Sequence, residues 1–187
     1  MPERLIPTAA TVAVGLLSGV LACTSAPAWA ALAVGDAAPA IHSTGALAGQ
    51  TFDFDLAAAL AAGPVVVYFF PKAFTQGCTM EAKAFADATP QFAALGATVV
   101  GISHDDIATL QRFSTEACRD QFAVVSDPEA RSINAYDAAS LRPGVASRIS
   151  YVIAPGGRIA FVHEGGDPLQ HVQATWEAVQ ELAGRDQ

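Results

Sequence analysis

The stretch YFFPKAFTQGCTME, residues 68–81, decides the fold of this chain. It begins inside a continuous apolar run, Val65–Phe70, which is typical of a central strand buried on both faces. Pro71 ends the run because proline has no N–H to donate to a sheet. The residues that follow predict a helix over Gly77–Leu95, with one apolar stripe formed by Phe85, Ala88, Phe92 and Leu95. The stretch therefore predicts a buried strand, a loop, and a helix with Cys78 in its first turn.

Cys78 lies where a protein backbone can stabilise a thiolate, the nucleophilic form of cysteine. The unpaired amides and the positive end of the helix attract an anion at this point. Thr75 can aim a hydroxyl at the same place, and Pro71 offers an apolar wall. Two plainer interpretations remain open at this stage. A cysteine among apolar residues is often a small core residue, and a threonine before a helix is often only its cap.

Strands and helices alternate on both sides of this stretch. Residues 31–50 are rich in alanine and glycine and are interpreted as an extended lead-in, followed by a strand over 51–56 and a helical turn over 57–62. Further along, the pattern predicts strands over 98–103 and 122–125, helices over 104–119 and 127–136, a hairpin of 148–154 with 158–163, and a last helix from Asp167-Pro168. The fold class is therefore α/β, with a mixed central sheet flanked by helices in one domain.

The chain resembles the peroxiredoxins, in particular the bacterioferritin-comigratory (PrxQ-type) subgroup. Pro71, Thr75 and Cys78 reproduce the P-x-x-x-T-x-x-C signature of that family. Three later segments resemble the family in the same order: VVGISHDD (99–106), VVSDPEARSINAYD (124–137) and SRISYVIAPGGRIAFV (147–162). The resemblance implies a thioredoxin fold with a peroxiredoxin-type N-terminal extension.

The resemblance also implies a role for each residue of the motif. Cys78 would be the peroxidatic cysteine, which attacks the O–O bond and becomes a sulfenic acid. Thr75 would hold the peroxide, and Pro71 would shield the pocket. Arg148 matches the active-site arginine of the family, although a plain surface ion pair is the alternative for it. Glu81 stands where the subgroup usually has glutamate, and we expect it to support the site by a hydrogen bond rather than to transfer a proton.

Resolution of the sulfenic acid is where this chain departs from its relatives. Many members of the subgroup carry a resolving cysteine five residues after the peroxidatic one, but that position is Lys83 here. Other members place it in a later helix, and Cys118 lies near the end of the corresponding segment, a few residues later than usual. We therefore expect a catalytic Cys78–Cys118 disulfide. A buried unreactive thiol, a permanent structural disulfide and a one-cysteine mechanism are the alternatives.

Composition and spacing exclude several other classes of protein. The net charge of −8 and the lack of a basic cluster argue against nucleic-acid binding. His42, His104, His163 and His171 are scattered, so we expect no metal or cofactor and interpret all four as surface or loop residues. A thioredoxin-like thiol–disulfide oxidoreductase needs C-x-x-C and a copper chaperone C-x-x-x-C, but Glu81 and Ala82 occupy those positions. A non-catalytic thioredoxin-fold binding domain would not need the intact motif.

The first thirty residues are interpreted as a targeting segment. Residues 1–30 read as a signal peptide with an A-x-A cleavage site that ends at Ala30, which leaves a peroxiredoxin domain over 31–187. An uncleaved anchor and a lipoprotein acylated at Cys23 are the alternatives. We expect an exported, periplasmic protein with no membrane attachment unless Cys23 is lipidated. Its expected partners are a hydroperoxide and a thiol reductant such as a thioredoxin-like protein, and it would be a monomer or homodimer.

Overall fold

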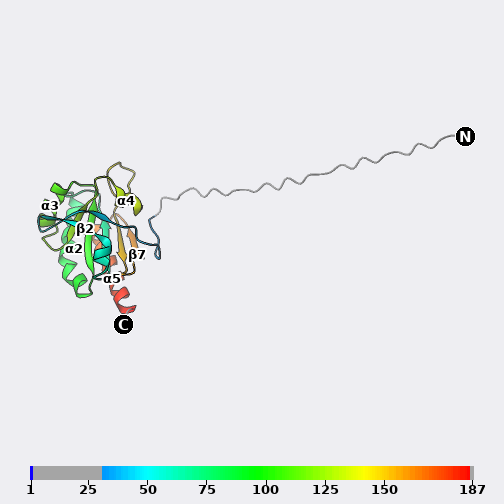
Figure 1. Cartoon of the computed structure of the whole chain (residues 1–187). Helices are drawn as coiled ribbons and strands as arrows, with labels where there is room; N and C mark the ends of the chain where they lie inside the picture. The colour runs from blue at the N-terminus through cyan, green and yellow to red at the C-terminus, as the bar shows by residue number, and fades with distance from the viewer. Residues whose placement is uncertain (2–30, 186–187) are drawn as a thin grey trace.

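The computed structural model describes residue 1 and residues 31–185. The predicted cleavage site and Cys23 lie outside the described residues. The elements gather around one sheet (Figure 1). In chain order they are β1 (His42–Leu47), β2 (Gln50–Asp55), α1 (Leu56–Leu60), β3 (Val65–Phe69), α2 (Gln76–Ala94), β4 (Thr98–Ser103), α3 (Ile107–Glu116), β5 (Ala123–Ser126), α4 (Arg131–Ala135), β6 (Ile149–Ile153), β7 (Ile159–Glu164) and α5 (Pro168–Arg185).

The sheet is mixed, and its strand order is β2-β1-β5-β4-β3-β6-β7. The strands β3, β4 and β5 run parallel, whereas β6 pairs with β3 antiparallel and β7 pairs with β6 antiparallel. Every residue of β3 and of β6 is buried. The prediction of a central strand at Val65–Phe70 is therefore confirmed, and this strand delivers the chain to the loop before Cys78.

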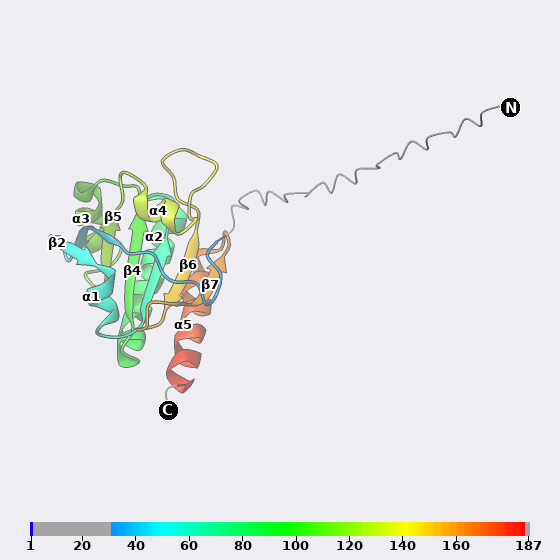
Figure 2. The same ribbon diagram turned by 45° about the vertical axis from the view of Figure 1, so that its right-hand side comes forward.

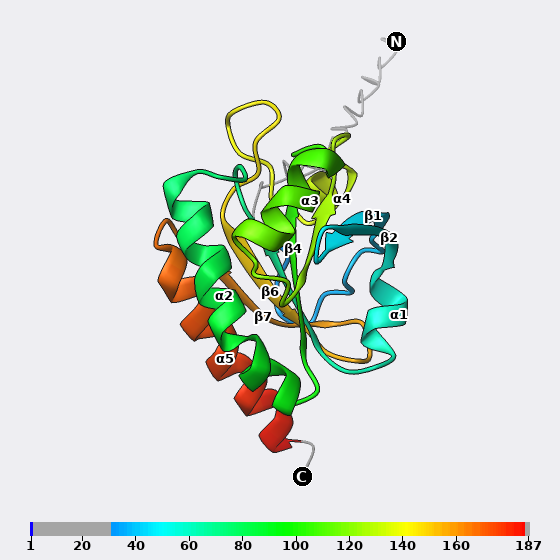
Figure 3. The same cartoon turned by 90° about the vertical axis from the view of Figure 1, so that its left-hand side faces the viewer.

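Two layers of helices cover the sheet. Figure 3 shows α2 and α5 side by side on one face and α1 on the opposite face, and Figure 2 shows α5 lying along β6 and β7. Side chains of β3 alternate between the two faces: Val66 and Tyr68 belong to the core under α2, α3 and α5, and Val65 and Val67 belong to the core under α1 and α4. Both cysteines, Cys78 and Cys118, lie in the first of these, which we call the α2-side core.

The expectation of an extended lead-in over 31–50 is wrong for its second half. Residues 42–47 form β1, which lies between β2 and β5 in the sheet. A tight turn at Ala48 and Gly49, both with positive φ, joins β1 to β2. Position 45 of this strand holds a glycine because a Cβ there would lie only 3.0 Å from the ring of Phe52. The small residues that hid the strand are therefore required by its packing.

The start of α4 also differs from the expectation. The Asp127-Pro128 pair was expected to open the helix, but the helix begins at Arg131, after Ala130 in a left-handed conformation with φ of 53°. The carboxylate of Asp127 accepts hydrogen bonds from the backbone N–H groups of Arg131 and Ile133, at 2.9 and 2.8 Å. Asp127 therefore caps the first turn of α4 from four residues before the helix begins, rather than as its first residue.

Among the residues that the structure describes, no helix combines the length and the apolar character that crossing a membrane requires.

Candidate active site

Cys78 occupies the first turn of α2, as the sequence predicts. The helix begins at Gln76 after Thr75, and the backbone N–H of Thr79 donates to the carbonyl of Thr75 at 2.9 Å. The N–H groups of a helix's first turn have no acceptor inside the helix, so they face the region of the sulfur. The residue is 1% exposed, and water therefore has little access to the sulfur in this conformation.

Arg148 reaches this sulfur from the start of β6. Phe69 of β3 pairs with Ile149, which places Arg148 beside the loop that leaves β3. Its Nη2 lies 3.4 Å from Sγ of Cys78, and its Nη1 donates to the carboxyl group of Glu81. The Arg148 side chain is 11% exposed, so its charge is poorly screened. The guanidinium thus joins two side chains of α2 that lie one helical turn apart.

Gly77 makes the approach of the guanidinium possible. A Cβ at residue 77 would lie 3.3 Å from Nη2 of Arg148, closer than ordinary van der Waals contact. The family signature leaves this position free, so sequence reasoning missed the requirement. The close approach of a long cationic side chain to the helix backbone explains the glycine.

Glu81 is fully buried beneath Arg148. Burial raises the pKa of its carboxyl to about 8, while the charge and the hydrogen bond of Arg148 act in the opposite direction. Only Oε2 is engaged: none of the described residues offers Oε1 a hydrogen-bond partner. Burial thus shifts this carboxyl toward its protonated form, in which it would neutralise less of the charge that Arg148 presents to Cys78.

Thr75 and Pro71 line the loop in front of the helix. Thr75 is exposed and extended, and its hydroxyl donates to the carbonyl of Lys72 at 3.0 Å instead of capping the helix. The plain interpretation of Thr75 as a side-chain cap is therefore wrong. The hydroxyl oxygen keeps its lone pairs for a further donor, such as a peroxide O–H. Pro71 is half-buried at the start of this loop.

Asp105 fixes this loop, and sequence reasoning missed it. Its Oδ2 accepts the backbone N–H of Ala73 at 2.7 Å and the hydroxyl of Ser103 at 2.9 Å. The carboxylate follows β4, which is the parallel neighbour of β3, so the two strands deliver their following loops to the same edge of the sheet. The acid in VVGISHDD could have signalled this, since acids at the end of a parallel strand often bind a neighbouring loop.

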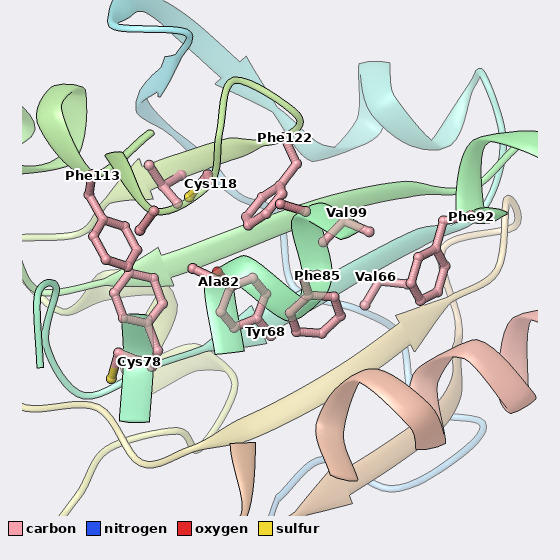
Figure 4. Packing of buried hydrophobic residues seen from close by; sticks show 14 of the residues in the cluster. Val66, Tyr68, Cys78, Ala82, Phe85, Phe92, Val99, Phe113, Cys118 and Phe122 are labelled. Carbon is pink, nitrogen blue, oxygen red and sulfur yellow. The ribbon is translucent and has the colours of Figure 1, made fainter. Parts of the chain in front are cut away.

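Cys118 lies directly after α3 and its cap residue Ala117, and it is fully buried. Burial, and secondly the charge of Asp120, raise the pKa of this thiol well above its ordinary value. Both described cysteines are free thiols, and Figure 4 shows their sulfur atoms apart within the α2-side core. The structure thus shows a reduced state in which the two residues share a core but are not joined.

Two of the four histidines are not surface or loop residues, contrary to the expectation: His171 is buried in α5, and His163 is half-buried in β7 with its Nε2 buried. His171 is fully buried at the start of α5, where its Nδ1 lies 2.8 Å from the hydroxyl of Ser150 and its Nε2 lies 3.0 Å from the carbonyl of Gly165. A carbonyl can only accept, so Nε2 carries the proton and Nδ1 accepts from Ser150. Burial lowers the pKa of His171 to about 4. The part of the chain that the structure describes contains no group of three or more potential metal-binding side chains.

Comparison with known proteins identifies the family. The AhpC/TSA family matches residues 34–162. The chloroplastic peroxiredoxin Q of Populus jackii is 34% identical over 121 residues, which cover 64% of this chain and 56% of that protein. The peroxiredoxin Q of Oryza sativa subsp. japonica is 33% identical, with 64% and 55% covered. The chain thus spans about half the length of the curated relatives that it matches.

Solved structures confirm the predicted fold. Peroxidoxin BcpB from Mycobacterium tuberculosis superposes with a TM-score of 0.72 and 25% identity, covering 80% of this chain and 97% of that one. The bacterioferritin comigratory protein of Xanthomonas campestris, studied for its alkyl peroxide reduction activity, gives a TM-score of 0.67 and 26% identity, with 75% and 91% covered. The mixed sheet flanked by helices is therefore a thioredoxin fold of the peroxiredoxin type.

Proposed function

Because the chain belongs to the AhpC/TSA family of peroxiredoxins, we propose that it is a thiol-dependent peroxidase that reduces hydrogen peroxide and organic hydroperoxides. One observation carries the proposal: a buried cysteine at a helix N-terminus with an arginine nitrogen 3.4 Å from its sulfur. The guanidinium and the helix N-terminus both direct positive charge toward the sulfur. The same charge can also stabilise the oxygen that departs when a peroxide bond breaks.

The reaction at Cys78 is a displacement on oxygen. The thiolate attacks one peroxide oxygen, the O–O bond breaks, and the other oxygen leaves as hydroxide or alkoxide, which takes up a proton. The sulfur is oxidised to a sulfenic acid and the peroxide is reduced to water or an alcohol. Thr75 would orient the peroxide through its hydroxyl, Pro71 would limit access of water, and Arg148 would stabilise both the attacking and the departing atoms.

Cys118 would then resolve the sulfenic acid. Its sulfur attacks the sulfur of Cys78, a disulfide forms, and the hydroxyl of the sulfenic acid leaves as water with the proton of the Cys118 thiol. An external thiol reductant, such as a thioredoxin-like protein, would return the pair to the reduced state. Disulfide formation needs Cα atoms within about 7 Å, and Figure 4 shows the two sulfur atoms apart, so we infer that the first turn of α2, the segment after α3, or both unwind during this step.

The segment after α3 is suited to such a change. Arg119 and Asp120 follow Cys118 with φ of 54° and 61°, a conformation that costs non-glycine residues free energy. An ion pair between Arg119 and Asp87 of α2 holds the segment against the helix, and both partners are exposed. Exposed pairs stabilise a protein by about 0–1 kcal/mol, so this one resists unwinding only weakly.

A peroxide-consumption assay with dithiothreitol tests the peroxidase directly. Cys78→Ser should abolish turnover while leaving the fold intact, because an alcohol is far too weakly acidic to replace the thiolate. Cys118→Ser is the matched control, since it removes a buried sulfur of the same core. We expect it to keep the single-turnover reaction with peroxide. Activity above a trace in Cys78→Ser would show that the sulfur of Cys78 is not the nucleophile.

Intact mass after one equivalent of peroxide tests the resolving step. Loss of two hydrogens, with no thiol left to alkylate, supports a Cys78–Cys118 disulfide. A stable gain of one oxygen with Cys118 still alkylatable would establish a one-cysteine mechanism instead.

The protein would carry out this chemistry outside the cytoplasm, in the periplasm, where it would act as an antioxidant. The proposal rests on the residues up to Ala30, read as a cleaved signal peptide. Mass spectrometry of the protein purified from its native host tests this proposal. A mature chain that starts at Ala31 supports export and cleavage, a diacylated chain that starts at Cys23 supports a lipoprotein, and an intact N-terminus contradicts both.

A further inference from the structure

Tyr68 carries a buried hydroxyl with no evident structural purpose. The residue is fully buried in β3, and its ring stacks on Phe85 of α2 at a centroid distance of 4.5 Å. None of the described residues offers the hydroxyl a hydrogen-bond partner. Leaving a buried polar group unpaired lowers stability, and phenylalanine would fill the same space without that cost. The hydroxyl therefore calls for an explanation outside the resting structure.

The ring of Tyr68 leans across the sheet toward β5. Tyr68 pairs with Gly101 of β4 on one side and with Ser150 of β6 on the other. A Cβ at Gly101 would lie 2.7 Å from Cζ and 2.8 Å from the hydroxyl oxygen of Tyr68. The far end of the ring thus lies over β4, which places the hydroxyl on the side away from β6 and Arg148.

Beyond β4 lies β5, and the chain enters β5 through Cys118 and Phe122. The rings of Tyr68 and Phe122 are 6.0 Å apart, and Figure 4 shows Tyr68, Phe122 and Cys118 in the same cluster. Burial raises the pKa of Tyr68 well above its ordinary value, an ionised Cys118 would raise it further, and Arg148 lowers it. The phenol therefore stays protonated, and it is a free donor in the same buried cluster as the thiol of Cys118.

The resolving step needs such a donor. Burial and the charge of Asp120 keep the thiol of Cys118 protonated at neutral pH, and a protonated thiol is a poor nucleophile. A hydrogen bond to the charged form stabilises a thiolate. Tyr68 belongs to the central strand of the sheet, so its hydroxyl keeps its place while the ends of α2 and α3 unwind.

We propose that the hydroxyl of Tyr68 donates a hydrogen bond to the sulfur of Cys118 as that thiol loses its proton and attacks the sulfenic acid of Cys78. The S–S bond forms, the S–O bond breaks, and the departing hydroxide takes up the thiol proton to leave as water. Tyr68 is neither oxidised nor consumed. This inference rests on the proposed resolving role of Cys118 and adds a residue that promotes that step alone.

The test is Tyr68→Phe, which removes one oxygen atom and keeps the ring. The rate of sulfenic acid formation at Cys78, measured in a single turnover with peroxide, should not change. Disulfide formation should slow about tenfold or more, because a donor to a charged group is lost. Its pH profile should move to higher pH, since the thiolate of Cys118 is less stabilised. The sulfenic acid should accumulate, as a gain of one oxygen in the intact mass.

Tyr136→Phe is the matched control. Tyr136 is also fully buried, but it lies on the α1 side of the sheet, where its hydroxyl donates to the carbonyl of Pro39 at 2.7 Å. We expect Tyr136→Phe to lower stability and to leave the rate of disulfide formation unchanged. Tyr68→Phe should be at least as stable as the wild type, because it loses an unpaired hydroxyl.

The outcomes separate this inference from the proposed function. Disulfide formation in Tyr68→Phe at the wild-type rate and pH profile would overturn the role of the hydroxyl while leaving Cys118 as the resolving residue. Failure of the wild type to form the Cys78–Cys118 disulfide would overturn both. An equal slowing in Tyr136→Phe would show that the effect comes from altered packing, and that result also contradicts the proposal.

Discussion

Arg148 is the residue on which the electrostatics of the site depend. It contacts the sulfur of Cys78 with one nitrogen and the carboxyl of Glu81 with the other. Cys78 and Glu81 therefore share the single positive charge of Arg148. A protonated Glu81 accepts a hydrogen bond without neutralising the guanidinium, so the charge acts on the sulfur. Arginine fits this position better than lysine, because its planar group presents several donors at fixed angles.

Arg148→Met should keep the alkyl stem and lose the charge. We expect the second-order rate with peroxide to fall about 100-fold or more, the magnitude typical for removing one preorganised donor at a developing charge. Alkylation of Cys78 at a fixed neutral pH should also slow, because the reacting sulfur loses its cationic partner. Stopped-flow peroxide kinetics and iodoacetamide alkylation measure the two effects.

Arg142→Met is the matched control, because Arg142 lies exposed in the loop before β6. Arg142→Met should keep the wild-type rate with peroxide and the wild-type rate of alkylation at Cys78. An Arg148→Met variant in which Cys78 is alkylated at the wild-type rate would contradict the contact between the guanidinium and the sulfur.

Sequence reasoning could point to the candidate residues of the site but not to the contacts between them. The P-x-x-x-T-x-x-C spacing is local, so Cys78 is placed by a few residues around it. Arg148 is 70 positions away, and only the family resemblance pointed to it. The raised pKa of Glu81 depends on burial by several elements, which no local pattern encodes. Gly77 was missed for the same reason, since the side chain that approaches it comes from β6.

At the scale of elements, the loop between β3 and α2 is held from β4. Asp105 accepts the N–H of Ala73, and Asp106 beside it caps α3 through the N–H of Thr109 at 2.8 Å. The two adjacent acids thus have different roles. Asp105 fixes the loop before Cys78, and Asp106 caps α3. This difference can be tested with a matched pair of variants.

Asp105→Ala should slow the reaction with peroxide about tenfold, because the N–H of Ala73 loses its acceptor and the loop is no longer held in one conformation. Asp106→Ala should lower the free energy of unfolding, the usual effect of removing an N-cap, and leave the peroxide rate unchanged. Single-turnover kinetics and urea denaturation distinguish them. Equal kinetic effects in both variants would refute the anchoring role of Asp105.

The packing of β3 on β4 depends on one glycine. The end of the Tyr68 ring covers Gly101, and a Cβ there would meet ring atoms at 2.7–2.9 Å. Gly101→Ala should therefore lower the free energy of unfolding by about 1–3 kcal/mol, since the buried ring cannot move away freely. Gly156→Ala is the control, because a Cβ there meets nothing within 4 Å. Thermal and urea denaturation measure both, and equal stability of the two variants would be evidence against this packing.

Most elements could be predicted from periodicity, and the exceptions have physical causes. The apolar run at β3 and the stripes of α2 and α5 are long and strongly patterned. The strand β1 was hidden because close contact with Phe52 demands small residues such as Gly45. The start of α4 was displaced because Asp127 caps the helix from four positions away. A contact between neighbouring strands decided the first structure, and a side-chain hydrogen bond within the turn decided the second.

At the scale of the whole molecule, His171 ties together three parts of the fold. It belongs to α5, receives a hydrogen bond from Ser150 of β6, and donates to Gly165 in the turn after β7. Ser150 lies two positions after Arg148 on the same face of β6. The packing of α5 on the sheet therefore supports β6, the strand that follows Arg148. These two hydrogen bonds require His171 to be neutral.

Stability should depend on pH through two buried groups of opposite sign. The pKa of His171 falls from 6.5 to about 4 on folding, so the unfolded chain binds a proton that the folded one does not. Its contribution is present above pH 6.5 and is lost as the pH falls through 4. The pKa of Glu81 rises from 4.5 to about 8. Its contribution is present below pH 4.5 and is lost as the pH rises through 8.

Urea denaturation from pH 4 to pH 8.5, followed by far-UV circular dichroism, separates the two groups through their neutral variants. The difference in unfolding free energy between the wild type and His171→Asn should narrow as the pH falls from 6.5 to 4, because only the wild type pays for excluding a proton. The difference between the wild type and Glu81→Gln should narrow as the pH rises from 4.5 to 8, because only the wild type must keep on its buried carboxyl a proton that the unfolded chain releases. Each variant serves as the control for the other, since above pH 6.5 His171 is neutral in both states and below pH 4.5 Glu81 is protonated in both. A Glu81→Gln difference that stays constant up to pH 8.5 would mean that Glu81 is already ionised at neutral pH, and that Arg148 is neutralised by its carboxylate instead of acting on Cys78.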